Sequence, residues 1–226
     1  GTSMGAVVGA MVVAWGSAGA ALERWREALR QQLIPSVPPL RRLPEPHEHP
    51  LLQVARRIRN RIVVSMVVNR VTVLDGGALL RAFEFLVPPR DLTELRPPVL
   101  VVATDLDTGE EVWIRQGTLG QALAASCAIP GLLPAVKVYD RLLLDGGVVA
   151  EVPVSAGRSL GWPVVAVDVS MALPPLNRNG LVLDTMMRSQ MMTSTLLRRH
   201  QLQGASLVVR PEVGHATWAD WALFDD

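Results

Sequence analysis

The chain has 226 residues, which is long enough to bury a sizeable core, and residues 1–226 are predicted to form a single domain. Hydrophobic residues make up 49% of the chain and charged residues 19%, which excludes disorder over most of its length. The formal net charge of +1 at pH 7 argues against nucleic acid as a general partner, and no apolar run reaches the roughly 18 residues that span a bilayer.

Helical patterns dominate the first part of the chain. Residues 4–15 are apolar on nearly every side and predict a buried helix, whereas residues 18–33 carry apolar side chains at helical spacing and predict an amphipathic helix. A proline-rich connection at about residues 35–50 excludes a helix or a central strand there. Residues 51–62, with arginines on one side, favour a further helix, and residues 78–86 predict another.

The rest of the chain alternates predicted strands and helices. Continuous apolar runs at residues 99–103 and 164–167 are typical of strands that are buried on both faces. The other predicted elements are strands at 112–115, 142–144 and 206–210 and helices at 117–127, 154–160 and 181–203. This alternation predicts an α/β fold with a parallel or mixed sheet and helices on both of its faces.

The first five residues, Gly1-Thr2-Ser3-Met4-Gly5, spell G-x-S-x-G directly before the apolar helix. This is the pattern of a nucleophile elbow, in which a serine sits on a sharp strand-to-helix turn. A Cβ at Gly1 or Gly5 is expected to clash where backbone approaches backbone. The helix N-terminus behind Ser3 favours a developing oxyanion, for which the Met4 N–H is a candidate donor. The alternative is an ordinary helix start in which Ser3 serves only as the N-cap.

Asp145 is the candidate base for this serine. It ends an apolar strand pattern, and Gly146 and Gly147 follow it and permit close backbone approach. The alternative is a hairpin turn, because Asp-Gly is a strong hairpin signal. A second Asp-Gly-Gly copy at residues 75–77 leads into a helical pattern, so it predicts a helix cap.

The histidines offer the other candidate bases. Two of the four lie in the proline-rich connection, where they are interpreted as solvated loop residues. His200 lies near a predicted helix end, where a cation meets the C-terminal dipole. His215 is the one candidate for a triad, so a Ser3–Asp145–His215 arrangement stays open as an alternative to a Ser–Asp pair.

Four sequence blocks occur in an order that carries a family resemblance. They are GTSMGA at 1–6, VVATDLDTGE at 101–110, ASCAIPG at 125–131, and DGGV at 145–148 followed by VPV at 152–154. Together they resemble the bacterial patatin-like phospholipase family, which consists of serine hydrolases that use a Ser–Asp dyad. The blocks come in the family's order and cover nearly the whole chain, which makes them more specific than any single motif.

The resemblance implies a patatin-like three-layer α/β/α sandwich with a mostly parallel central sheet. It also implies a serine acyl hydrolase of lipid acyl esters, of the phospholipase A, lysophospholipase or carboxylesterase type. In that reading Ser3 is the nucleophile and Asp145 is the base, with no histidine between them. Gly146 and Gly147 would support the carboxylate, and the Met4 N–H would donate to the oxyanion.

The chain departs from the family pattern in three places. The family's glycine-rich oxyanion loop and first strand lie upstream of the elbow, so the chain is expected to be a fragment that is truncated at its N-terminus. Glu151 stands where the family often has asparagine, and the family's C-terminal helix is missing or cut short after Asp226. A catalytically silent regulatory or scaffolding module is therefore a second alternative.

No cofactor and no metal are expected, because His, Cys and carboxylate residues do not cluster at ligand spacing. The expected partner is a lipid or small ester. The basic segment 51–62 suits peripheral contact with the inner face of the membrane in a cytoplasmic protein, the alternative being a solvated helix face.

Cys127 is interpreted as a small buried hydrophobe. Core-gap filling, with an acyl groove as the alternative, is predicted for Met186, Met187, Met191 and Met192.

Overall fold

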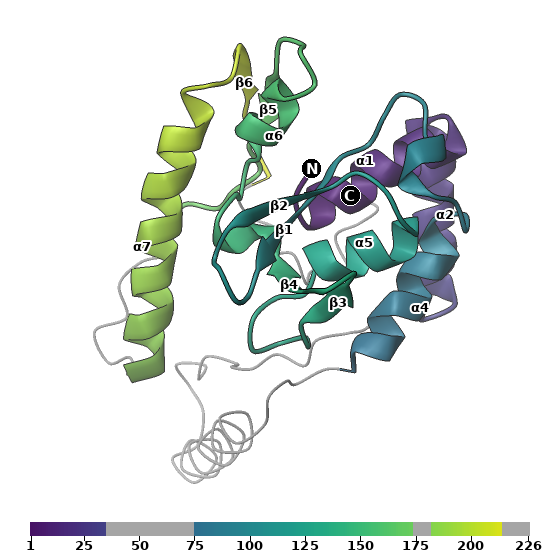
Figure 1. Ribbon diagram of the computed structural model, residues 1–226, viewed down its shortest axis with the longest axis horizontal. Coiled ribbons are helices and arrows are strands. Elements are labelled where there is room, and N and C mark those ends of the chain that lie inside the picture. Colours follow the sequence, from purple (N-terminus) through teal and green to yellow (C-terminus); the bar gives the residue numbers. More distant parts are fainter. Residues whose placement is uncertain (35–74, 174–181, 214–226) are drawn as a thin grey trace, which may run out of the picture.

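The computed structural model describes residues 1–34, 75–173 and 182–213, which form an α/β arrangement (Figure 1). The main sheet has four strands in the order β2-β1-β4-β3. A second sheet pairs β5 with β6. The strands are β1 Val101–Asp105, β2 Glu111–Ile114, β3 Val136–Val138, β4 Arg141–Asp145, β5 Val165–Val167 and β6 Leu207–Val209.

The strands of the four-stranded sheet pair antiparallel throughout, so the prediction of a mostly parallel sheet is wrong for this sheet. Two tight connections are the physical reason, because a short link can join only antiparallel neighbours. One joins β1 to β2 through Gly109 at φ 73, and the other joins β3 to β4 through Tyr139 at φ 53. Among the described residues, parallel pairing occurs between β5 and β6 and at one bridge between Thr2 and Val102.

The helices lie where the sequence predicts them, with ends that differ by a few residues. They are α1 Met4–Trp15, α2 Ala18–Arg30, α4 Gly76–Leu86, α5 Leu119–Ser126, α6 Val154–Arg158 and α7 Val182–Leu202, with short 3-10 turns at η1 Leu92–Glu94 and η2 Gly146–Val148. Strand β3 was not predicted, since its three residues are too few to show a period. The proline-rich connection 35–50 and the predicted helix 51–62 lie outside the described residues.

The two Asp-Gly-Gly copies have different structures. Asp75 caps α4 by accepting a hydrogen bond from the Gly77 N–H at 3.0 Å, as the sequence predicts. Asp145 ends β4 and leads into the turn η2, so the alternative of a hairpin turn at this point is wrong.

The core lies between the sheet and the helices α1, α4 and α5. Helix α5 is buried over most of its length and packs on β1, β3 and β4, while α1 and α4 pack against α5 (Figure 1). The prediction that α1 is buried is confirmed for one side only, where Ala6, Val7, Ala10 and Met11 are buried, since Val8 is 52% exposed. Alternate residues of β1 face opposite ways. Val101 and Ala103 join the α5 core, and Val102 joins a smaller cluster with Ala150.

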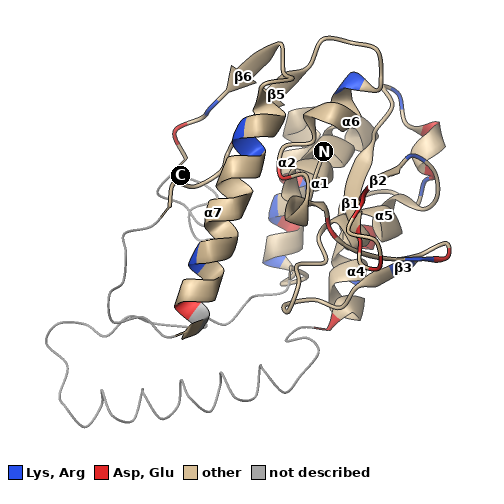
Figure 2. Cartoon of the chain, turned by 60° about the vertical axis from the view of Figure 1, so that its left-hand side comes forward, with Lys and Arg blue, Asp and Glu red and all other residues tan. Residues whose placement is uncertain are grey.

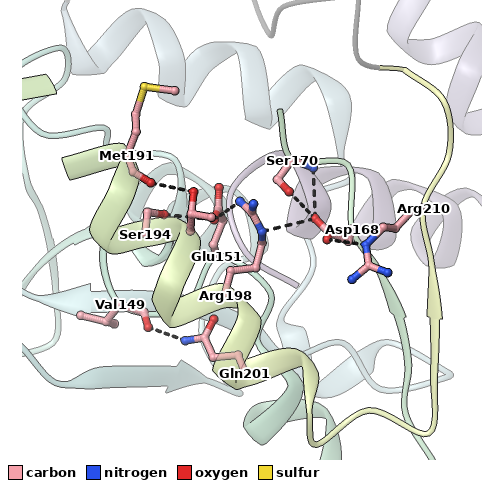
Figure 3. A network of polar contacts seen from close by, with 10 residues as sticks. Val149, Glu151, Asp168, Ser170, Met191, Ser194, Arg198, Gln201 and Arg210 are labelled. Carbon is pink, nitrogen blue, oxygen red and sulfur yellow. Dashed lines mark hydrogen bonds and ion pairs between the residues drawn. The ribbon is translucent and has the colours of Figure 1, made fainter. Parts of the chain in front are cut away.

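Helix α7 stands apart from this core and is held mainly near its C-terminal end. Its first turn contains the acidic residue Asp184, and its last turn contains Arg199 and His200. Figure 2 shows the acidic residue at one end of the helix and basic residues further along it. Arg198 bonds to Glu151 at 2.9 Å, and the Gln201 side chain donates to the Val149 carbonyl at 2.6 Å (Figure 3).

The prediction that the α7 methionines fill core gaps is wrong for Met186, Met187 and Met192, which are 63%, 60% and 46% exposed.

Candidate active site

One edge of β1 brings the N-terminal residues and β4 together. Thr2 pairs with Val102 in parallel, and the Val102 N–H donates to the Gly1 carbonyl at 2.9 Å. At the next position of β1, Ala103 pairs with Asp145 in antiparallel register. Strand β2 occupies the opposite edge, so the two segments meet end to end along a single edge.

This register puts the serine and the aspartate on one face of the sheet. Paired residues point their side chains the same way, and successive residues alternate. Thr2 therefore shares the face of Val102, and its hydroxyl donates to the Ala150 carbonyl on that face at 2.7 Å. Ser3 and Asp145 share the face of Ala103, which is the face that α5 covers.

The Ser3 hydroxyl donates a hydrogen bond to Asp145 Oδ2 at 2.7 Å. Ser3 immediately precedes α1 and has φ 48 and ψ −128, a left-handed backbone conformation that is uncommon for a residue with a Cβ. Such a conformation costs about 1–3 kcal/mol and persists only where its surroundings hold it. The structure thus brings together the two residues that the sequence singled out, on a sharp turn from strand to helix.

Backbone and side-chain contacts fix Asp145 from several directions. Its second oxygen, Oδ1, accepts the Gly147 N–H at 2.7 Å. Its own N–H donates to the Ala128 carbonyl at 3.0 Å, and its carbonyl accepts the Thr104 hydroxyl at 2.9 Å. The residue is only 7% exposed, so the carboxylate has one fixed orientation, toward Ser3.

Burial raises the pKa of Asp145 above the ordinary value for an aspartate. The hydrogen bonds from Ser3 and Gly147 oppose this rise, and the negative charge of Glu151 adds to it. The neighbouring Cys127 thiol is buried, as predicted, and its pKa is raised first by burial and then by the charge of Asp145. It therefore stays a neutral thiol beside the carboxylate.

The glycines of the elbow and of the Asp-Gly-Gly turn have unequal steric roles. A Cβ at Gly1 would lie 2.8 Å from the Ala6 nitrogen and from the Gly5 carbonyl carbon, so the predicted clash is present there. The same prediction is wrong for Gly5, because Gly5 is exposed and a Cβ there meets no described atom within 4 Å. A Cβ at Gly146 would lie 2.4 Å from the Val102 oxygen, and one at Gly147 would lie 3.0 Å from Asp145 Oδ1.

The N-terminus of α1 offers a donor beside Ser3. The Ser3 N–H is already bonded to the Ser126 hydroxyl oxygen at 2.8 Å, whereas the described residues supply no acceptor for the Met4 N–H. The first turn of α1 contains no acidic residue that would compete with an anion. The side chains of Met4 and Val8, 40% and 52% exposed, place an apolar surface next to this end of the helix.

Sequence reasoning missed the buried hydroxyls that surround the Ser3–Asp145 pair. Ser126 is fully buried, and Thr104 and Thr2 are 3% and 8% exposed. Each hydroxyl donates to a backbone carbonyl next to the pair. Ser126 stands among the small apolar residues of α5, and this pattern could have predicted a buried hydroxyl, which requires a hydrogen-bond partner. The partners themselves could not be predicted without the strand register.

The sequence profile of the patatin-like phospholipase family matches residues 1–157, the part of the chain that holds the elbow, β1, β4 and the aspartate turn. The chain belongs to this family.

Curated relatives of the chain are uncharacterized members of the NTE family from mycobacteria. One, from Mycobacterium tuberculosis (strain ATCC 25618 / H37Rv), is 34% identical over 101 residues, which are 45% of this chain and 26% of the relative. A second from the same strain is 33% identical over 82 residues, which are 36% of this chain and 14% of the relative. A relative from Mycobacterium bovis (strain ATCC BAA-935 / AF2122/97) is 34% identical over 101 residues. The matched region thus spans about a quarter or less of these patatin-like relatives.

The other predicted features fall partly outside the described residues. His215 lies there, as do the two histidines of the proline-rich connection, while His200 lies exposed on α7. Within the described ranges, no three or more His, Cys, Asp or Glu side chains are grouped so that they could hold a metal ion. No single described helix is long and apolar enough to cross a membrane, although α1 and α2, bent by 115°, pass that test as a pair. Membrane contact through residues 51–62 stays a prediction.

Replacing Gly146 with alanine tests the close approach that positions the aspartate turn. The added Cβ would meet the Val102 backbone oxygen at 2.4 Å, and backbone in a central strand cannot move aside. We expect Gly146→Ala to lower the free energy of unfolding by about 1–3 kcal/mol in urea titrations. Gly9→Ala is the matched control, because a Cβ there meets no described atom within 4 Å and alanine favours a helix. Equal stability of the two variants would contradict the close approach.

Proposed function

We propose that the chain is a serine acyl hydrolase of lipid acyl esters, of the phospholipase A, lysophospholipase or carboxylesterase type, that works through a Ser3–Asp145 dyad. One observation carries the proposal. At a strand-to-helix turn, Ser3 has φ 48, and its hydroxyl donates to the buried carboxylate of Asp145 at 2.7 Å. Membership of the patatin-like phospholipase family supports the choice of an ester of a lipid as substrate.

The reaction would proceed in two halves. Ser3 Oγ attacks the ester carbonyl carbon while its proton passes to Asp145 Oδ2, and the alcohol leaves with that proton as the acyl-enzyme forms. A water molecule then attacks the acyl-enzyme and gives its proton to the same carboxylate. Asp145 returns the proton to Ser3 Oγ as the fatty acid is released.

The environment of Asp145 supports its role as a base without a histidine. An ordinary aspartate, with a pKa of about 3.9, is a weak base toward a serine hydroxyl. Burial raises the pKa of Asp145 and so brings it closer to that of the group it must deprotonate. The hydrogen bond from the Gly147 N–H holds the opposite oxygen, which leaves Oδ2 directed at Ser3.

Two features beside Ser3 support binding of an acyl ester. The Met4 N–H at the start of α1 would donate to an oxyanion, with the positive end of the helix dipole behind it. The resemblance to the family implies further donors from a glycine-rich loop upstream of the elbow. The exposed apolar side chains of Met4 and Val8 would contact the acyl chain.

For the fold we propose the three-layer α/β/α sandwich of the family. Helix α5 packs on the face of β1 that carries Val101 and Ala103. Ala150 and Ala156, which flank and belong to α6, pack on the opposite face with Val102. Helices on two faces of β1 support three layers.

Replacement of the dyad residues in the full-length protein tests this proposal on a short-chain p-nitrophenyl ester. Ser3→Ala should lower kcat/KM by at least about 10³-fold, because it removes the nucleophile. Asp145→Asn should lower it by at least about 10²-fold, because an amide is no base. His215→Ala should stay close to wild type. A loss in His215→Ala as severe as that in Ser3→Ala would replace the dyad with the Ser3–Asp145–His215 triad.

The pH dependence of hydrolysis gives an independent test of the base. Because Asp145 acts only when it is ionised, kcat/KM should fall as the pH drops through its raised pKa. The charge of Glu151 raises that pKa, so Glu151→Gln should lower it and move the acid limb of the profile to lower pH. Glu94→Gln, an equal charge change at an exposed residue of η1, should leave the limb in place. A limb that stays fixed or moves to higher pH in Glu151→Gln would contradict Asp145 as the base.

A further inference from the structure

Where the two segments meet on the edge of β1, the pairing changes from parallel to antiparallel. Thr2 is the last residue that pairs with Val102, and β4 begins its pairing one position further on, at Ala103. The chain turns into α1 at Ser3, which ends the pairing of the N-terminal residues with β1. At this point the Ser3 N–H and the carbonyl of the fully buried Val102 lie close to α5, and buried backbone groups of this kind need partners.

The Ser126 hydroxyl serves both of these groups at once. It accepts the Ser3 N–H at 2.8 Å and donates to the Val102 carbonyl at 2.6 Å. Ser126 is the last residue of α5 and is 0% exposed. A hydroxyl can donate one hydrogen bond, and that of Ser126 goes to the Val102 carbonyl. Ser126 therefore has no free proton to donate to a substrate.

We propose that Ser126 is the positioning residue of the nucleophile, which holds the Ser3 peptide in its left-handed conformation. This inference rests on the proposed function of Ser3. With its N–H turned inward to Ser126, Ser3 keeps φ 48 and directs its hydroxyl at Asp145. The next amide, that of Met4, is then the one left without an acceptor among the described residues. One buried hydroxyl thereby positions both the Ser3 nucleophile and the Met4 N–H, which is the candidate oxyanion donor.

Removal of this hydroxyl should lower the rate of catalysis by displacing Ser3. In Ser126→Ala the Ser3 N–H loses its acceptor, so the bond that turns it inward no longer opposes relaxation of the positive φ of Ser3. Displacement of a reacting group by about 1 Å lowers the rate by about 10²-fold. The apolar surface formed by Met4 and Val8 is untouched, so substrate binding should be retained.

Two measurements on the full-length protein test this role. In Ser126→Ala, kcat for a p-nitrophenyl ester should fall by about 10²-fold with KM nearly unchanged. Hydrogen exchange of the Ser3 amide should become faster, since its bond to a buried acceptor is lost. Val138→Ala, which truncates a buried side chain in β3, controls for a general loss of stability. It should change neither quantity at a temperature where both variants are folded.

Either of two results would overturn the proposal. One is a kcat for Ser126→Ala that matches that of Val138→Ala, and the other is a Ser3 amide that exchanges at the wild-type rate in Ser126→Ala. Failure of the proposed function has a different signature, which is full hydrolysis by Ser3→Ala. Hydrogen exchange of the Ser3 amide tests its bond to Ser126 independently of the rate of ester hydrolysis.

Discussion

The register of two segments along one edge of β1 is the constraint on which the site depends. Thr2 lies opposite Val102 and Asp145 opposite Ala103, so two segments far apart in the sequence occupy neighbouring positions. Side chains alternate along a strand, and a slip of β4 by one residue would turn the carboxylate to the other face of the sheet. The contact between Ser3 and Asp145 is therefore a consequence of sheet pairing. This also explains why Gly146 must lack a Cβ, because a Cβ there would lie 2.4 Å from the Val102 oxygen.

Buried hydroxyl groups add hydrogen bonds at the point where the two segments meet. The pairing on β1 changes there from parallel to antiparallel, and the Ser126 hydroxyl bonds to the amide of Ser3 and the carbonyl of Val102. The Thr104 hydroxyl holds the carbonyl of Asp145 in the same way. These contacts attach the reactive pair to α5 and β1, which are the most deeply buried elements of the patatin-like core. A strained serine and a buried carboxylate both have a higher free energy than relaxed, solvated groups, and rigid surroundings with many hydrogen bonds maintain them.

Much of this arrangement could be predicted from the sequence. Helix α1, the strands β1 and β4 and the cap at Asp75 follow from local patterns, because periodicity and turn chemistry act over a few residues. Local patterns also single out Ser3 and Asp145 one by one, whereas their pairing was implied by the family resemblance. The antiparallel sheet could not be predicted, because apolar runs such as residues 99–103 look the same in parallel and antiparallel strands. The role of Ser126 depends on the register of β1, which no local pattern contains. The predicted clash at Gly5 was wrong for a related reason. The motif has two glycines, but only the three-dimensional turn shows that a Cβ would meet backbone atoms at Gly1 and not at Gly5.

The most direct test of the dyad is the labelling of the folded, full-length protein with a fluorophosphonate, followed by location of the modified residue by mass spectrometry. Such a reagent reacts with an activated serine, and activation here requires the carboxylate that lies 2.7 Å from Ser3 Oγ. A Ser3–Asp145 dyad predicts modification of Ser3 and of no other serine, and a much slower modification in folded Asp145→Asn. An unlabelled wild-type protein would identify a catalytically silent member of the patatin-like family. Labelling of Asp145→Asn at the wild-type rate would show that Asp145 is not the base.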